Sequence, residues 1–337
     1  MTYKMQSISP EILTAPEELN AIYTQIKPYV RLTPLMESSH LSELISGKVL
    51  VKPESLQVTG AFKFRGALYR LMQLDKYQKK QGVMAYSSGN FAVGLAHAGR
   101  ILDISVHLVM PFDAPINKIE NVRRQGASIT LCHDFQPSRE EAASEMAAAL
   151  ARRHEYVLLH PFDDPLLING QATVGVELRQ QLLEGGLTCD SLLCPSGGGS
   201  LVAGCSFTFS PVTNGSEIYA IESLGYDGMS LSLRERVVTR AAGGASSDCD
   251  ALLALTPGQA AFNIARLTAV KGLSVSESYV KQALRLAFEE LHLVLEPSGA
   301  IALAAVLAFP EKFHRQTLVI IASGGNVDLN KYRSLVF

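Results

Sequence analysis

Short runs of Val, Ile and Leu alternate along this chain with longer segments of helical periodicity. Such alternation is typical of βα units, in which helices connect parallel strands. Most of the runs are apolar on both faces, so helices should cover both faces of the sheet. We therefore predict an α/β fold, with strands at residues 48–52, 83–87, 105–110, 128–132, 156–160, 191–195, 217–222 and 317–323.

The composition of the chain excludes several classes of protein. Its 337 residues suit about two domains of ~150 residues each, and 47% apolar with 18% charged residues is typical of a compact fold. A formal charge of −2 argues against a nucleic-acid partner. The most apolar run, residues 300–309, has half of the ~20 residues that a membrane span needs. Residues 1–10 lack the apolar core of a signal peptide and the five cysteines form no C-x-x-C pair, so we expect a cytoplasmic protein.

Several helix boundaries are marked by capping residues. Ser138-Arg-Glu-Glu141 and Ser274-Val-Ser-Glu277 fit the capping box, in which a hydroxyl and a carboxylate satisfy reciprocal backbone amides. After the second box, helical spacing predicts one buried stripe of Val280, Ala283, Leu284, Ala287, Phe288 and Leu291. Pro115 and Pro297 suit the first turn of a helix. Residues 238–250, with two glycines and two serines, predict a mobile loop.

Lys63 is the first candidate catalytic residue. It lies between Phe62 and Phe64, with Gly60 and Gly66 three residues to either side. Neighbouring aromatic rings can desolvate the amine, which lowers its pKa and leaves free amine for covalent catalysis. The alternative is a surface lysine in the first turn of the helix that follows.

A small polar loop, Ser87-Ser88-Gly89-Asn90-Phe91, follows the predicted strand 83–87 and precedes a helix that ends near Leu102. In α/β sheets such a loop presents free backbone amides to an anion, here a substrate carboxylate. An ordinary tight turn with a Ser or Asn cap is the alternative.

Two further small-residue loops follow predicted strands. Pro195-Ser196-Gly197-Gly198-Gly199-Ser200 precedes a helix that begins at Leu201. Three successive glycines cost backbone entropy, which is tolerated best where amides wrap closely around a phosphate, although a flexible turn is the alternative. Its spacing matches neither the P-loop nor the dinucleotide-binding fingerprint. Ser323-Gly-Gly-Asn326 ends the strand 317–323, so three loops predict a ligand site at the carboxyl edge of the sheet.

Together these motifs resemble the fold type II pyridoxal-phosphate enzymes, in particular the branch of threonine/serine dehydratases (ammonia-lyases) and serine racemases. The resemblance covers about residues 21–329 and also includes Thr33-Pro-Leu35, Asn169-Gly-Gln-Ala-Thr173 and Glu296-Pro-Ser-Gly299. It implies a fold like the tryptophan synthase β subunit, with two three-layer α/β/α domains and mostly parallel sheets. The large domain, which binds pyridoxal phosphate, would comprise residues 1–74 and 160–337, and the small domain, with the substrate-carboxylate loop, residues 75–159. A homodimer or higher homo-oligomer is also implied.

The resemblance implies roles for individual residues. Pyridoxal 5′-phosphate would be bound covalently to Lys63 beside the ring of Phe62, and Asn90 would hydrogen-bond the cofactor's 3′-oxygen. Ser323 would face the pyridine nitrogen, which a hydroxyl cannot protonate as an aspartate would. The phosphate cradle would comprise Gly197, Gly198, Gly199, Ser200 and Leu201. The loop that binds the substrate carboxylate would comprise Ser87, Ser88, Gly89, Asn90 and Phe91.

The implied reaction is the dehydrative deamination of L-threonine or L-serine to 2-oxobutanoate or pyruvate and ammonia, with Lys63 removing the α-proton. Ser88 matches the serine that relatives use to reprotonate Cα from the opposite face, so a serine racemase is one alternative. A dehydratase of 3-hydroxyaspartate or phenylserine is another. A second cation near Ser88 would suit 3-hydroxyaspartate, and the loop itself has none. A protein that binds the cofactor or a nucleotide without catalysis is the last alternative.

Two positions depart from the pattern of the family. Phe91 stands where many relatives have histidine, which leaves the choice of substrate open. The family's divalent-cation site uses an acid after the strand 217–222 and further ligands four and six residues on. Glu222 fits the first position, but Gly228 occupies the last and Asp227 is displaced by one. We therefore expect no metal site, and we expect no regulatory domain because the chain ends about where the catalytic module ends.

Overall fold

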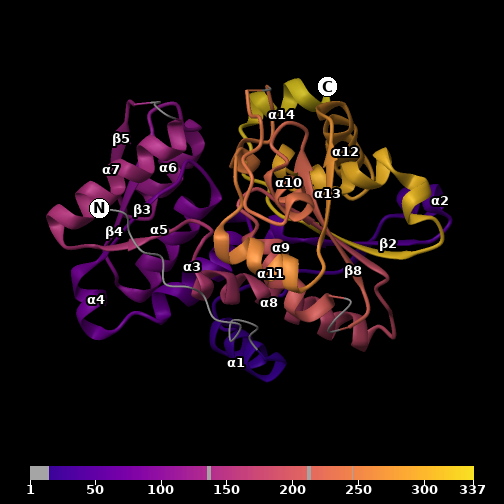
Figure 1. The fold of residues 1–337 in the computed structure, drawn as a ribbon, viewed down its shortest axis with the longest axis horizontal. Helices are drawn as coiled ribbons and strands as arrows, with labels where there is room; N and C mark the ends of the chain where they lie inside the picture. The colour runs from indigo at the N-terminus through magenta and orange to yellow at the C-terminus, as the bar shows by residue number, and fades with distance from the viewer. Residues whose placement is uncertain (1–14, 135–137, 211–213, 245) are drawn as a thin grey trace.

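The computed structural model describes residues 15–134, 138–210, 214–244 and 246–337. Two sheets form two lobes, one with the indigo to magenta strands β3, β4 and β5 and the other with most of the orange and yellow segments (Figure 1). All strand pairs in the described residues are parallel except β1 with β2. The predicted α/β fold with mostly parallel sheets is confirmed. Residues 1–10, on which the expected absence of a signal peptide rests, lie outside the described residues.

The larger sheet has the order β1-β2-β10-β7-β8-β9. Its strands are β1 (Met36–Glu37), β2 (Lys48–Pro53), β7 (Ser191–Pro195), β8 (Glu217–Ser223), β9 (Lys271–Val275) and β10 (Thr317–Ala322). Successive residues of β10 pack on opposite faces: Val319 and Ile321 join one apolar cluster, and Leu318, Ile320 and Ala322 join another. The first cluster includes residues of α1 (Pro16–Ile26), α3 (Lys63–Met72), α8 (Pro165–Glu184), α9 (Ser200–Phe209) and α11 (Gln259–Leu267), and the second those of α2 (Ser39–Ile45), α12 (Glu277–Glu289), α13 (Pro297–Ala308) and α14 (Leu329–Val336).

The smaller sheet has the order β5-β4-β3-β6. Its strands are β3 (Val83–Tyr86), β4 (Val106–Pro111), β5 (Ser128–Cys132) and β6 (Val157–Leu159). Met84 and Val109 pack against the alanines of α7 (Arg139–His154), whereas α5 (Asn90–Leu102) and α6 (Ile116–Arg124) join the cluster on the other face. The four strands and α4 (Lys76–Gln81) fall within residues 75–159, and the exact domain boundaries stay a prediction.

The eight predicted strands are present with ends within one residue of the predicted ones. Strands β1 and β9 were not predicted, because β1 has only 2 residues and the residues of β9 are mostly half-buried and include a glycine rather than an apolar run. A Cβ at Gly272 would lie 2.2 Å from Ser230 Oγ, so this glycine allows α10 (Gly228–Glu235) to pack against β9.

Two predicted helix starts, at Ser274 and Pro115, differ from the structure, and one residue of a predicted buried stripe is exposed. Ser274 lies in β9, and α12 begins at Glu277 after Ser276, whose side chain makes no capping hydrogen bond. Phe288, predicted to be buried, is 38% exposed, while the other members of that stripe are buried. Ser138 does cap α7 through its Oγ, and Pro297 occupies the first turn of α13, but Pro115 directly precedes α6.

Residues 238–250 carry no helix or strand in their described part until the 3₁₀ turn Asp250–Leu252. Several contacts hold this loop, and among them the carboxylate of Glu277 accepts hydrogen bonds from Ser247 Oγ and Asp248 N. The prediction of a loop is confirmed, and its mobility stays a prediction.

A buried ionic cluster connects β2, α3 and α8. Arg65 donates to both oxygens of Glu54 at 2.8 Å and to Glu177 Oε2 at 3.0 Å, and Lys52 Nζ lies 2.6 Å from Glu177 Oε1. All four side chains are fully buried. Because the two cations match the two carboxylates, loss of one partner leaves an uncompensated charge in the core.

We predict that Glu177→Ala lowers the free energy of unfolding by about 3–5 kcal/mol, since it leaves Lys52 and part of Arg65 unpaired in the core. Glu37→Ala is the matched control, because Glu37 forms an exposed ion pair with Lys48 worth about 0–1 kcal/mol. Urea denaturation followed by circular dichroism measures both values. Equal losses for the two variants would show that the buried cluster does not stabilise the fold.

Candidate active site

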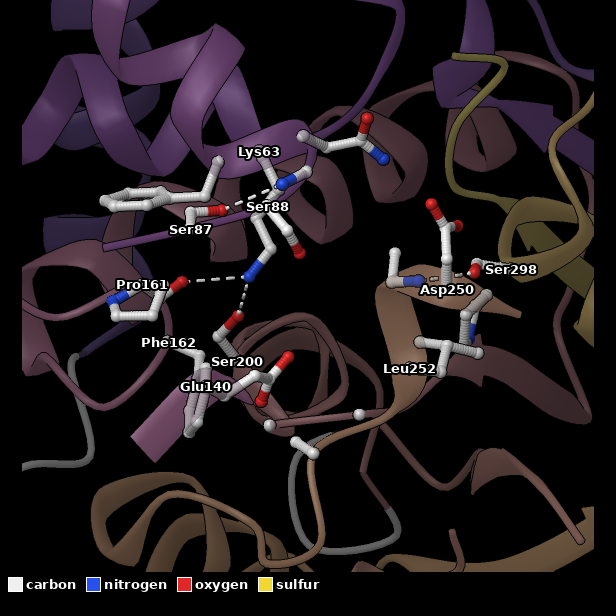
Figure 2. A pocket seen from close by; sticks show the side chains of 18 of the residues that line it. Lys63, Ser87, Ser88, Glu140, Pro161, Phe162, Ser200, Asp250, Leu252 and Ser298 are labelled. Atoms are coloured by element: carbon white, nitrogen blue, oxygen red, sulfur yellow. Dashed lines mark hydrogen bonds between the residues drawn. The ribbon is translucent and has the colours of Figure 1, made fainter. Parts of the chain in front are cut away.

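One pocket lies where loops from both sheets meet, and it encloses about 940 Å³, part of it open to solvent. Loops after β2, β3, β7 and β10 contribute to its wall, and Figure 2 shows Lys63, Ser87, Ser88 and Ser200 from the first three of these segments. All the site residues predicted from sequence line it: Phe62, Lys63, Ser87, Ser88, Gly89, Asn90, Phe91, Gly197, Gly198, Gly199, Ser200, Leu201 and Ser323.

Lys63 is the first residue of α3 and projects into the pocket (Figure 2). Its Nζ donates to the carbonyl oxygen of Pro161 at 3.0 Å and to Ser200 Oγ at 3.3 Å, and it lies 5.3 Å from the centre of the Phe62 ring. Burial lowers the pKa of Lys63 to about 8, because its nearest acceptors are uncharged and the carboxylate of Glu140 compensates only in part. The amine is therefore largely available in neutral form at mildly alkaline pH.

The glycine loop before α9 has no room for side chains. A Cβ at Gly198 would lie 2.1 Å from the ring of Phe162, and one at Gly197 would lie 3.0 Å from Leu252 Cα. Gly199 has a φ of +87°, in the left-handed region that favours glycine, and it directly precedes α9. The backbone amides at the start of this ten-residue helix can therefore approach an anion closely.

The loop after β3 forms the opposite wall. Gly89 N donates to Ser87 Oγ at 3.2 Å, and Asn90 begins α5. The ring of Phe91 is 2% exposed and belongs to the main apolar cluster, which accounts for an aromatic residue at this position.

Asn90 contacts two residues that sequence reasoning left without a role. Its Nδ2 donates to Glu296 Oε1, and its Oδ1 accepts a hydrogen bond from Asn326 Nδ2 at 2.9 Å. Both belong to motifs noted in the sequence, so the signal was present, but their side-chain partners depend on tertiary contacts.

Lys118 was not found from sequence, where no motif marks it. This fully buried residue of α6 lies 2.8 Å from Asp250 Oδ2 and 3.5 Å from Glu296 Oε2, and its Nζ is 3.9 Å from the position of a Cβ at Gly89. The two carboxylates raise the pKa of Lys118 despite its burial. A cation therefore lies beside the Ser88-Gly89 loop, and it comes from another helix.

Glu222 does not face an open site. Its two oxygens accept hydrogen bonds from Met229 N, Ser230 N and Ser230 Oγ at the start of α10, at 2.8, 2.8 and 2.5 Å. Burial raises the pKa of Glu222 to about 7. The expectation that no metal binds here stays a prediction.

Comparison with known proteins assigns the chain to a family. Residues 26–324 match the family described as "Pyridoxal-phosphate dependent enzyme". This chain belongs to that family. Serine racemase from Dictyostelium discoideum is 31% identical over 95% of this chain and 97% of its own length. A beta-hydroxyaspartate dehydratase from Paracoccus denitrificans (strain Pd 1222) is 33% identical over 94% and 97%. The crystal structure of a T.th. threonine deaminase is 36% identical, with a TM-score of 0.86, and covers 94% of this chain and 99% of that chain.

Membership of this family implies pyridoxal phosphate as the cofactor, and the fold is that of the fold type II enzymes. The pocket fits this group for two reasons. The Lys63 amine, whose pKa is lowered, lies 3.3 Å from Ser200 Oγ at the start of α9, and the adjacent glycine loop has no room for side chains.

None of the helices in the described segments has the length and apolar character needed to cross a bilayer.

We predict that Lys63 titrates in the cofactor-free protein with a pKa near 8, about two units below exposed lysines. Burial disfavours the charged form and thereby lowers the pKa. The amine is therefore mostly protonated below about pH 8 and mostly neutral above it. Reductive ¹³C-methylation followed by NMR over pH 6–11 measures the titration, and Lys63→Arg identifies the resonance by its loss. A Lys63 resonance that titrates above pH 10 would contradict the proposed desolvation.

Proposed function

We propose that this chain is an ammonia-lyase that converts L-threonine and/or L-serine to 2-oxobutanoate or pyruvate and ammonia, with pyridoxal phosphate carried on Lys63. The observation on which this rests is the position of the Lys63 amine between the glycine loop and the Ser87–Phe91 loop, with its pKa lowered to about 8. The names of the threonine deaminase and dehydratase relatives support an elimination reaction.

The residues of the pocket divide between the cofactor and the substrate. Gly197 to Leu201 would bind the phosphate through the amides at the start of α9, and Phe62 would pack beside the ring. Asn90 would donate to the 3′-oxygen. The Ser87–Phe91 loop would bind the substrate carboxylate.

The bound cofactor supplies an electron sink for the pair of electrons left at the substrate Cα when its proton is removed. Lys63 would become a free neutral amine when the amino group of the substrate replaces it on the cofactor, and it would then take that proton. Ser323 would offer a hydroxyl rather than a carboxylate to the pyridine nitrogen, which would favour prompt loss of the β-hydroxyl over transamination. Pro161 and Ser200 orient the Lys63 amine through their two hydrogen bonds.

The charges around the pocket favour an uncharged β-substituent. Among the described residues that line it, Lys63 is the basic side chain, and Glu140, Asp250 and Glu296 are acidic. Lys118, behind the substrate loop, is already balanced by Asp250 and Glu296. A second substrate carboxylate would therefore meet no uncompensated positive charge, so we rank threonine, serine and phenylserine ahead of 3-hydroxyaspartate.

Serine racemase activity is the second candidate. Ser88 lines the same pocket as Lys63, and the Dictyostelium relative is named a serine racemase. Ser88 would return a proton to Cα from the face opposite Lys63.

Three further properties stay predictions: the oligomeric state, the cytoplasmic location and the domain boundaries at residues 75 and 160. Light scattering of the purified protein measures the oligomeric state.

We predict that the purified protein with pyridoxal phosphate has a visible absorption band and releases 2-oxo acid from L-threonine or L-serine. Lys63→Ala should abolish the band and lower the rate by at least ~10²–10⁴-fold, because it removes both the covalent attachment and the base. A panel of 3-hydroxy amino acids, assayed for 2-oxo acid, ranks the substrates. A wild-type protein that stays colourless with added cofactor would rule out this function, and a coloured but inactive one would favour a binding protein.

We predict that Ser88→Ala lowers conversion of L-serine to D-serine by ~10²–10⁴-fold and affects pyruvate release much less, because only racemisation needs a second proton donor. Chiral chromatography and a pyruvate assay on the same sample give both rates. Wild-type racemisation faster than elimination would make racemase the main activity. An equal loss of both products in Ser88→Ala would show that Ser88 is not a racemisation-specific proton donor.

A further inference from the structure

The side-chain amide of Asn90 is fixed at both ends by residues from the other lobe. Its Nδ2 donates to Glu296 Oε1, and its Oδ1 accepts from Asn326 Nδ2 at 2.9 Å. Asn326 Nδ2 also donates to the backbone carbonyl of Thr59 at 2.8 Å. A backbone carbonyl oxygen can only accept hydrogen bonds. Thr59 O therefore determines which way the Asn326 amide faces, and Asn326 in turn determines which way the Asn90 amide faces.

Two glycines make room for this network. A Cβ at Gly60, where φ is +77°, would lie 2.5 Å from Asn326 Oδ1. A Cβ at Gly324 would lie 2.3 Å from Glu296 Oε1 and 3.0 Å from Asn90 Nδ2. Non-bonded atoms do not approach each other as closely as 2.5 or 2.3 Å, so a side chain at either position would displace Asn326 or Glu296. These glycines of the Lys63 and Ser323 motifs thus serve the polar network.

Glu296 does not fix the Asn90 amide by itself. It is 1% exposed, and burial raises its pKa, although the Lys118 amine, 3.5 Å from Glu296 Oε2, opposes this rise in part. A carboxyl group can accept a hydrogen bond and, when protonated, can also donate one. The contact with Asn326 is therefore needed to determine which end of the Asn90 amide faces Glu296.

We propose that Asn326 is a positioning residue, which fixes the Asn90 amide so that the second N–H of Nδ2 is presented to the pocket. This inference rests on the proposed function, in which Asn90 donates to the cofactor's 3′-oxygen. That oxygen carries negative charge, so an N–H group stabilises it and an amide oxygen would repel it. An Asn90 side chain without Asn326 could present either end.

The test compares Asn326→Asp with the wild-type holoenzyme. Aspartate has nearly the same shape but cannot donate, and its charge repels both Thr59 O and Asn90 Oδ1, which reverses the Asn90 amide. We expect a changed position or pH dependence of the visible cofactor band and cofactor binding weaker on the order of 10- to 100-fold, the effect of losing a hydrogen bond to a charged group. Asn330→Asp, the same substitution at an exposed position of α14, is the matched control and should leave both unchanged.

Two further variants separate positioning from a structural role. Asn326→Ala removes the donor without adding charge, so the same spectral change should appear in smaller degree. This variant also keeps the inference testable if Asn326→Asp does not fold. If Asn326 acts through Asn90, its substitution should add little to cofactor loss in an Asn90→Ala background, whereas a structural role would add in full. A wild-type spectrum and affinity in Asn326→Asp, or full additivity, would overturn the inference. A wild-type protein that binds no cofactor would instead overturn the proposed function.

Discussion

Strand β10 lies between β2 and β7 and runs parallel to both, so the segments that follow these three strands leave the sheet at the same edge. Phe62 N donates to Ser323 O at 3.1 Å, and Ala61 forms a bridge with Gly324, which holds the Lys63 segment against the end of β10. The glycine loop leaves β7 beside them. Residues 63, 197–201 and 323 therefore meet because of strand order, before any ligand binds.

The other wall comes from the smaller sheet, and polar side chains join the two lobes across the pocket. Asn90 and Lys118 belong to helices packed on the smaller sheet, whereas Glu296, Asn326 and Asp250 follow elements of the larger one. Each of these contacts involves at least one buried polar side chain, that of Asn90, Lys118 or Glu296, so misplacement would leave a buried polar group without a partner. The position of the substrate loop is thus coupled to the lobe that carries Lys63.

The sequence predicts those parts of the molecule whose signals are local. A strand that is buried on both faces is visible in the sequence as an apolar run. The loop that follows such a strand lies at the carboxyl edge of the sheet, where ligands bind. The pocket wall was predicted in this way from residues 63, 87–91, 197–201 and 323. Strand β9 is half-buried and lacks that signal. Ser274 and Glu277 match a capping box in sequence, yet the Glu277 carboxylate is used by Ser247 and Asp248 of a distant loop. Lys118 and Glu296 are paired through tertiary contacts, which no local pattern encodes.

Two lysines with desolvated amines show why loss of solvation alone does not identify a catalytic amine. Lys63 and Lys118 both lose solvation, which disfavours the charged form in each. Lys63 Nζ has hydrogen bonds to a carbonyl and a hydroxyl, so desolvation prevails and its pKa falls to about 8. Lys118 Nζ faces the carboxylates of Asp250 and Glu296, so attraction prevails and its pKa rises. The uncharged acceptors around Lys63 therefore distinguish a lysine that can take a proton from one that holds two lobes together.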